Sequence, residues 1–318
     1  MTKRECLDTC IEQKRSLHAA RVAIRENALL TLEKNNARYK EVKNSIASLG
    51  AKIALTAISG DKSRIETLKK TLLDLNGQRE KLLKEAGIGE VEYDCEKCHD
   101  TGFADGAPCE CVKKAAVELY LSELSAIVPI GECRFESFDL SFYPDVNTEG
   151  GNPKKRMTEI FKLCREYTIK FDPTSSESLL FMGNTGLGKT HLSLAIAYEL
   201  ILNGYNVIYG SAYNLFAKME GEHFGEHSDK SYLDAVGCDL LIIDDLGGEF
   251  VSPYIQSLVY NIINTRLLAR RPTVINTNLS MADINARYTP RVASRLLGEY
   301  TAKKFIGSDI RQQKSLKK

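Results

Sequence analysis

Hydrophobic residues recur at helical spacing through the first quarter of the chain. From about residue 5 to residue 86 there is no proline, and charged residues alternate with apolar ones. Gly50 and the SGDKS turn at 59–63 interrupt the pattern, which predicts two long helices folded back as an antiparallel coiled hairpin. The predicted seam positions are Leu32, Tyr39, Val42, Ile46 and Leu49, then Ile65, Leu68, Leu72, Leu75 and Leu82.

This helical region, assigned to residues 1–91, fits two interpretations. It is either a self-contained structural hairpin or an arm that pairs with the helices of another protein, and the sequence does not separate them. We adopt the partner-binding arm as the hypothesis to test.

A different pattern begins near residue 131 and continues to residue 318. Continuous apolar runs typical of buried parallel strands occur at 178–182, at 240–243 and within RPTVINTNLS, and helical segments separate them. One such helix is expected at about 252–270. This alternation predicts an α/β domain built on a central parallel sheet.

Composition limits the class of protein. The 318 residues are 43% apolar and 27% charged, which is typical of a folded protein. A net charge of +1 gives no global attraction to nucleic acid, so any such affinity must come from a local patch. The C-terminal end supplies a cluster of cations that also fits a solvated tail: Lys303, Lys304, Arg311, Lys314, Lys317 and Lys318, against the single anion Asp309.

The N-terminus MTKRECLDTC lacks the apolar core of a signal peptide, and no apolar run approaches the roughly 18 residues of a membrane span. We therefore expect a cytoplasmic protein that has no membrane partner.

Four of the nine cysteines are clustered within residues 95–111. Cys95 and Cys98 form a CxxC pair, and Cys109 and Cys111 form a tighter CxC pair after a glycine-rich loop. Four thiolates can enclose one tetrahedral zinc ion, which predicts a structural zinc module at 92–130. His99 could replace one thiolate, and unligated cysteines are the alternative. The isolated cysteines are interpreted as small apolar residues: Cys6, Cys10, Cys133, Cys164 and Cys238.

Residues 183–190 match GxxxxGK[ST] in full, between a predicted strand and a predicted helix. In that context backbone amides face phosphate oxygens, Lys189 reaches the β and γ phosphates, and the Thr190 hydroxyl ligates magnesium. The sequence thus predicts a site for a nucleoside triphosphate. The expected nucleotide-binding residues are Gly183, Asn184, Thr185, Gly186, Leu187, Gly188, Lys189, Thr190 and His191.

A second acidic site follows the strand at 240–243. Asp244 is expected to hold magnesium, and Asp245 to orient and activate the attacking water. Asn278, at the end of the next strand, is placed to sense the γ phosphate. Arg287, Arg291 and Arg295 follow on a predicted helix at 285–300. No NKxD motif is present, which favours ATP over GTP.

The order of these motifs resembles the AAA+ ATPases. IDDLGGEF, INTNL, RYTPRVASRL, FIGSDIR and the entry segment RFESFDLSFYPD resemble in particular the DnaC/DnaI-type replicative helicase loaders of the IstB/DnaC-like group. The resemblance covers residues 131–318 and implies an AAA+ core with ATP and Mg²⁺ but no helical lid domain. It also implies that the entry segment passes near the adenine and that Arg311 partly substitutes for the arginine of a lid.

The same resemblance implies a function. It suggests an ATP-dependent loader of a replicative helicase hexamer in DNA replication, which self-associates, binds single-stranded DNA and hydrolyses ATP slowly or only when assembled. Catalytic roles carry over to Lys189, Asp244 and Asp245, to Asn278 as sensor 1, and to Arg295 as an arginine finger acting in trans, with Arg291 as second choice. Tyr213, Phe216 and Lys218 are candidate DNA contacts that also fit core and rim positions.

Two other classes remain open. An IstB-like transposition helper would share the ATPase core and act on duplex DNA, and a non-enzymatic adaptor would bind ATP and barely hydrolyse it. The zinc module and the helical arm favour the loader, and the intact acids with Arg295 disfavour the adaptor.

Overall fold

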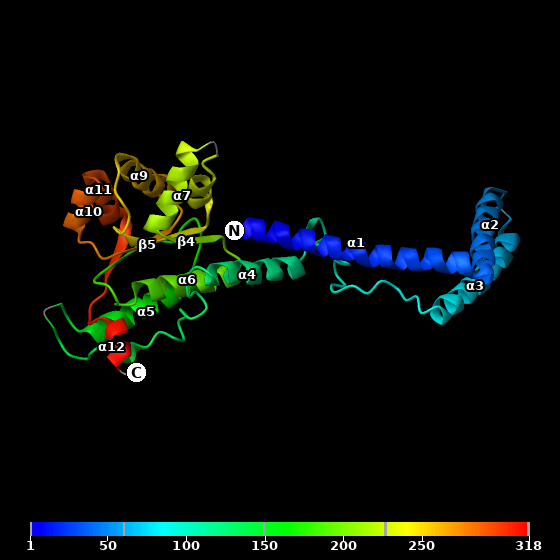
Figure 1. The fold of residues 1–318 in the computed structure, drawn as a ribbon, viewed down its shortest axis with the longest axis horizontal. Coiled ribbons are helices and arrows are strands. Elements are labelled where there is room, and N and C mark those ends of the chain that lie inside the picture. The colour runs from blue at the N-terminus through cyan, green and yellow to red at the C-terminus, as the bar shows by residue number, and fades with distance from the viewer. Residues whose placement is uncertain (1, 60, 149, 226–227, 317–318) are drawn as a thin grey trace. The chain divides into compact units, whose positions relative to one another are not determined.

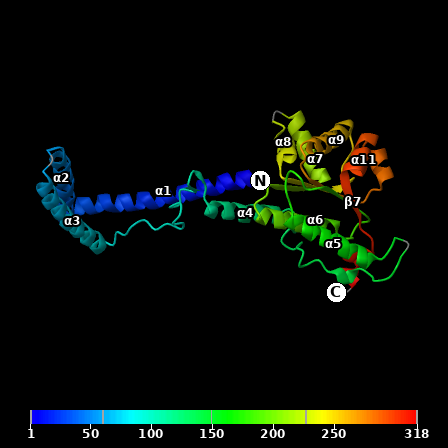
Figure 2. The same cartoon turned by 180° about the vertical axis from the view of Figure 1, so that it is seen from behind.

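The computed structural model describes residues 2–59, 61–148, 150–225 and 228–316. Gly60 of the predicted turn and Lys317 and Lys318 of the basic run lie outside the described residues. The chain divides into two compact units, which we call the arm unit (Leu7–Ala115) and the sheet unit (Met1–Cys6 with Ala116–Lys318). Figures 1 and 2 show the elements of each from opposite sides.

The arm unit contains the predicted antiparallel helix pair. Helix α1 spans Lys3–Asn35, α2 spans Ala37–Ser59 and α3 spans Lys62–Glu85. Helices α2 and α3 lie side by side (Figures 1 and 2), and Arg38 near the start of α2 bonds to Gln78 near the end of α3 at 3.1 Å. All ten predicted seam positions are buried or half-buried. The apolar spacing therefore identified the contact face correctly.

The prediction that Gly50 interrupts the helices is wrong, because Gly50 lies inside α2 and the region contains three helices. A glycine inside a helix costs only about 1 kcal/mol, which the seam contacts of α2 can offset. The break falls instead at Asn36, whose Oδ1 accepts a bond from the Tyr39 amide at 2.9 Å and so caps α2.

The cysteine-rich segment follows α3 in the arm unit. Two short antiparallel strands, β1 (Phe103–Ala104) and β2 (Ala107–Pro108), connect its two cysteine pairs. Helix α4 (Glu110–Ser125) begins at the second pair.

The sheet unit is built on the predicted parallel sheet, whose five strands have the order β4-β5-β6-β3-β7. Every pairing is parallel, and the three inner strands are almost entirely buried because helices cover both faces. The strands are β3 (Ser178–Met182), β4 (Val207–Ser211), β5 (Leu240–Leu246), β6 (Thr273–Thr277) and β7 (Tyr300–Lys304).

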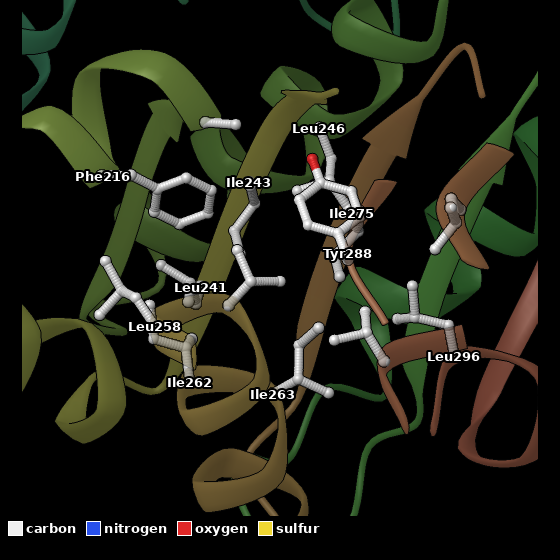
Figure 3. Packing of buried hydrophobic residues seen from close by; sticks show 14 of the residues in the cluster. Phe216, Leu241, Ile243, Leu246, Leu258, Ile262, Ile263, Ile275, Tyr288 and Leu296 are labelled. Atoms are coloured by element: carbon white, nitrogen blue, oxygen red, sulfur yellow. The ribbon is translucent and has the colours of Figure 1, made fainter. Parts of the chain in front are cut away.

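Helices α5 and α6 cover one face of this sheet, and α7, α9, α10 and α11 lie on the other (Figure 1). On the second face, side chains of α7, α9 and α11 pack against β5 and β6 in one apolar cluster (Figure 3). The remaining elements are η1 (Leu140–Phe142), α5 (Pro153–Ile169), α6 (Lys189–Leu202), α7 (Ala212–Phe224), α8 (Lys230–Gly237), α9 (Pro253–Leu268), α10 (Met281–Arg287), α11 (Pro290–Glu299) and α12 (Ile310–Leu316).

The helix expected to carry the three late arginines is two helices. Arg287 ends α10, whereas Arg291 and Arg295 lie on α11. Pro290 at the first turn and the Thr289 side chain, which caps the Val292 amide, start a new helix at this point. Among the described residues, no helix is long and apolar enough to cross a membrane.

Candidate functional site

The glycine-rich loop joins β3 to the first turn of α6, as the motif predicts. Gly183, Gly186 and Gly188 have φ angles of 143°, 75° and 88°, which favour glycine. Lys189 begins α6, and its ammonium donates to the carbonyls of Gly183 at 2.6 Å and Asn184 at 2.8 Å. Partial burial lowers the pKa of Lys189, although the carboxylates of the site oppose the shift.

Two segments distant in sequence lie against this loop. A side-chain carbon on Gly188 would approach the Phe138 ring and the Tyr143 hydroxyl to 2.9 Å, and one on Gly183 would meet the Phe305 carbonyl at 2.5 Å. The Tyr143 hydroxyl donates to the Leu187 carbonyl at 2.9 Å. The loop is therefore held between the entry segment and the residues that follow β7.

The two predicted acids lie at the carboxyl end of β5, where its register with β6 shifts between Ile243 and Leu246. Asp244 is buried, whereas Asp245 is exposed and has a φ of 54°. This irregularity directs the two adjacent carboxylates into different surroundings. A non-glycine residue in the left-handed region is typical of functional sites.

Among the described residues, every hydrogen-bond donor to the Asp244 carboxylate is neutral. The Thr190 hydroxyl lies 3.1 and 3.0 Å from its two oxygens. Asn276 of β6 donates to Oδ1 at 2.7 Å, and Tyr209 of β4 donates to Oδ2 at 2.6 Å. The amide of Asp245 also donates to Oδ1 at 3.1 Å. The structure thus brings together the glycine-rich loop and the β5 acid, 54 residues apart in sequence.

Sequence reasoning missed both Asn276 and Tyr209. Asn276 is a buried polar residue directly after the apolar pair Val274 and Ile275, a signal that could have identified it. Tyr209 has only its position near the carboxyl end of a strand to mark it. The predicted sensor, Asn278, lies one residue beyond β6 and is exposed, with no hydrogen bond to another described residue.

A cavity of about 990 Å³ in the sheet unit extends along this edge of the sheet. Its lining includes residues 185–191 of the loop, Phe138 of the entry segment, Tyr209, both β5 acids and Arg311. His191 lies on its wall with Nε2 2.9 Å from the Arg134 carbonyl. The cavity thus brings the backbone of the glycine-rich loop, Lys189 and the two β5 carboxylates around a single space.

This donor set fits a magnesium ion bound with a nucleotide. Thr190, Asp244 and Asp245 offer hydroxyl and carboxylate oxygens, which are the ligands Mg²⁺ prefers. Lys189 supplies a positive charge at the same cavity. Arg295 is half-buried on α11, and its side chain makes no hydrogen bond or ion pair within the part of the chain that the structure describes. Arg287, by contrast, donates to the carbonyl of Glu249.

The four cysteines of the arm unit converge as predicted, and their sulfurs all lie within 4.8 Å of one another. Cys95 and Cys109 are 3.8 Å apart, and Cys98 and Cys111 are 3.6 Å apart. A tetrahedral ion with Zn–S bonds of about 2.3 Å requires sulfur separations of about 3.8 Å, so the cluster fits zinc. The His99 ring instead lies against Tyr93, 4.7 Å between ring centroids.

Asp100 anchors this cluster to α1 within the arm unit. Its buried carboxylate accepts from the Cys95 amide at 3.1 Å and forms ion pairs with Lys14 at 3.0 Å and Arg21 at 3.1 Å. Backbone hydrogen bonding from Cys98 lowers the pKa of Cys95, whereas burial raises the pKa of Cys111 in the same cluster.

Comparison with known proteins agrees with this geometry. The family described as IstB-like ATP binding protein matches residues 162–299. The replicative helicase loader DnaC of Escherichia coli is 30% identical over 175 residues, which cover 54% of this chain and 66% of that protein. The chain carries an IstB/DnaC-like ATP-binding domain.

Other known proteins match about half of the chain. The ATP-binding protein of insertion sequence IS5376 from Geobacillus stearothermophilus is 26% identical over 148 residues, 46% of this chain and 53% of that protein. The crystal structure of the DnaC helicase loader matches with 22% identity and a TM-score of 0.46, covering 54% of this chain and 98% of that one.

The expected fold class is confirmed in its main features. The IstB/DnaC-like domain has a parallel five-stranded sheet between helices, and a helical region and a cysteine cluster that could bind zinc precede it. The matched segment spans less than two thirds of the length of the first curated relatives. The description of the matching family names ATP binding, and Mg²⁺ is the metal that the site's acids fit.

Proposed function

We propose that this protein is an ATP-dependent loader of a replicative DNA helicase. The observation that carries the proposal is the IstB/DnaC-like domain, 30% identical to a helicase loader, in which Thr190 and Asp244 meet at one cavity. Lys189 and the loop amides would bind the phosphates of ATP, and Thr190 and Asp244 would hold magnesium. Bound magnesium neutralises charge that develops on the phosphates.

Lys189→Ala tests the nucleotide site directly. The variant should lose binding of a fluorescent ATP analogue, because it removes the cation that faces the phosphates. Lys162→Ala is the control, since Lys162 is exposed on α5 and does not line the cavity. Equal binding by wild type and Lys189→Ala would contradict the assigned site.

ATP hydrolysis would require self-association in this proposal. Asp245 would activate water, Asn278 would sense the γ phosphate, and Arg295 would enter the site of a neighbouring copy. The absence of any partner for Arg295 among the described residues supports a role outside its own subunit. An isolated copy would then turn over slowly, which makes ATP chiefly a switch.

Arg295→Ala should keep nucleotide affinity and lose turnover in the assembled state by on the order of 10³-fold. Arg291→Ala, on the same helix and exposed, is the matched comparison. Loss of turnover in Arg291→Ala alone would transfer the role to Arg291, and unchanged turnover in both variants would exclude a finger on α11.

Single-stranded DNA is the proposed second ligand. His223, Phe224 and Tyr254 form an aromatic group with ring centroids 4.9 to 5.0 Å apart, and Phe224 is 70% exposed. Stacking on such rings contributes about 1–3 kcal/mol per base. Of the earlier candidates, Phe216 belongs to the core, whereas Tyr213 and Lys218 remain exposed.

Phe224→Ala should weaken binding of a fluorescent oligonucleotide by about tenfold, on the scale of one lost base stack. Ile169→Ala is the matched control, because Ile169 is also exposed but lies on α5, on the other face of the sheet. Equal loss in both variants would contradict an aromatic DNA site.

The arm unit is the proposed contact with the helicase. Helix α2 presents exposed apolar residues at positions 47, 51, 54, 55 and 58, which form one stripe, and Ile58 is 85% exposed. An unpartnered stripe of this kind supports docking to a partner helix.

The full chain should therefore retain the cognate helicase hexamer in a pull-down, and Ile58→Glu should lose it. Leu73→Glu on α3 is the control for an added charge at an exposed leucine. Recovery of a transposase in place of the helicase would favour the second candidate, an IstB-like transposition helper acting on duplex DNA, which the relative from an insertion sequence supports.

A further inference from the structure

Tyr209 forms a hydrogen bond to Asp244 to which the proposed magnesium site gives no role. It lies on β4 beside β5, with Tyr209 in register with Ile242 and Ser211 in register with Asp244. Its hydroxyl crosses to the neighbouring strand and donates to Asp244 Oδ2 at 2.6 Å. Neither the nucleotide-binding loop nor the β5 acid motif includes this residue.

The four donors around Asp244 divide unevenly between its oxygens. Oδ1 accepts from Asn276 at 2.7 Å and from the Asp245 amide at 3.1 Å. Oδ2 accepts from Tyr209, and the single Thr190 hydroxyl proton is shared between the two oxygens at 3.1 and 3.0 Å. Tyr209 is therefore the only described donor that belongs to Oδ2 alone.

The Tyr209 hydroxyl is the donor in this contact, because an ionised carboxylate can only accept a hydrogen bond. The residue also lines the cavity, so its contact with Asp244 lies at the edge of the nucleotide space and not in the apolar core.

We propose that Tyr209 is a positioning residue for the magnesium of the nucleotide site, acting through the orientation of the Asp244 carboxylate. Hydrogen bonds at both oxygens prevent the carboxylate from rotating, so that it meets the metal in one orientation. Partners that orient a metal-binding group typically change metal affinity 10–100-fold when they are removed. This inference rests on the proposed ATP function.

A purely structural role makes a different prediction. If Tyr209 only fills space, then Tyr209→Phe, which keeps the ring and removes one oxygen, leaves metal binding unchanged. Tyr209→Leu, which removes both, then impairs the site through lost packing. If the hydroxyl positions Asp244, both variants lose metal affinity to a similar extent.

The experiment measures Mn²⁺ binding to the full chain by electron paramagnetic resonance, with a saturating non-hydrolysable ATP analogue. We expect Tyr209→Phe to raise the Mn²⁺ dissociation constant by about tenfold or more. Binding of a fluorescent ATP analogue in the presence of EDTA should change less than about twofold, because the loop amides and Lys189 are intact. Tyr205→Phe is the control, since its hydroxyl donates to the Phe171 carbonyl at 3.1 Å, outside the site.

The possible outcomes distinguish a failure of the role proposed for Tyr209 from a failure of the proposed ATP function. Wild-type affinity for Mn²⁺ in Tyr209→Phe, or a loss confined to Tyr209→Leu, overturns the role of the hydroxyl and leaves ATP binding standing. A similar loss in Tyr205→Phe overturns it as well, because the effect would then not be specific to Asp244. If the wild-type chain binds no nucleotide with or without metal, the ATP function fails and the inference fails with it.

Discussion

A cluster of fully buried residues joins β5 and β6 of the sheet unit to helices α7, α9 and α11 (Figure 3). In the arm unit, none of the 24 residues of α3, all of which the structure describes, is buried. The sheet unit therefore gains its stability mainly from burying apolar surface. The arm unit depends on a half-exposed helix seam, helix caps and the cysteine cluster, so the two units should respond differently to the same kind of change.

Removal of zinc should give the largest difference in stability between the two units, because only the arm unit contains the cysteine cluster. Structural zinc contributes on the order of 10 kcal/mol of apparent binding free energy in small zinc modules, and that energy is coupled to folding. Cys98→Ser should lose bound zinc, and residues 92–111 should become sensitive to protease, while nucleotide binding by the sheet unit persists. Both effects can be measured by metal analysis and limited proteolysis.

Cys133→Ser is the control for this prediction, because Cys133 lies outside the cluster in the sheet unit. It should retain full zinc content. Purified protein with no zinc and four freely reactive thiols in the cluster would exclude the metal.

Truncation of an apolar side chain should destabilise the sheet unit more than the arm unit. Leu180 is fully buried in β3, and Leu180→Ala should lower the free energy of unfolding of the sheet unit by about 2–5 kcal/mol. Leu72 is half-buried in the α3 seam, so Leu72→Ala should cost the arm unit less, about 1 kcal/mol. Denaturant unfolding followed by probes in each unit would test the ranking. A larger loss for Leu72→Ala would mean that the seam is a true core.

How much the sequence could predict also differs between the units. The meeting of Thr190 with Asp244 was predictable, because parallel strands end at one edge of a sheet and both motifs follow strands. The contact of Tyr209 with Asp244 was not, since it depends on which strand lies beside β5. That neighbour is fixed by sheet order, and no local pattern records it.

In the arm unit, local spacing identified the seam but not the helix ends. Gly50 looked like a break because its intrinsic helix propensity is low. Asn36 was the actual break, and asparagine is favoured both in turns and at helix caps, so its presence does not identify a cap. Helix boundaries depend on small differences in free energy. Packing against other segments contributes to these differences, and the local spacing of apolar residues does not record it.

Replacement of a buried carboxylate in the sheet unit should cause a loss of stability of intermediate size. Glu249 follows the β5 acids, and its carboxylate accepts from the Gly247 amide at 3.0 Å and from the Tyr288 hydroxyl. Glu249→Gln should lower the stability of the sheet unit by about 2 kcal/mol, because the neutral amide weakens hydrogen bonds to a charged group. Thermal unfolding would measure the change.

Glu299→Gln, at an exposed position, is the control for loss of the charge itself and should change stability little. If Glu249→Gln were equally mild, the hydrogen bonds that the Glu249 carboxylate accepts from Gly247 and Tyr288 would contribute little to the stability of the sheet unit.

The smallest predicted effect is at a helix cap in the arm unit. The Asp61 side chain accepts from the Arg64 amide at 3.1 Å and so satisfies one of the free donors at the start of α3. Asp61→Ala should lower the stability of the arm unit by about 1 kcal/mol and leave the sheet unit unchanged. Asparagine caps a helix almost as well as aspartate, so Asp61→Asn should keep the stability of the arm unit. If both variants lose stability, the effect comes from the charge of Asp61 near the helix terminus. Because the arm unit lacks a deep core, a change of this size should be visible in its helical circular dichroism on heating.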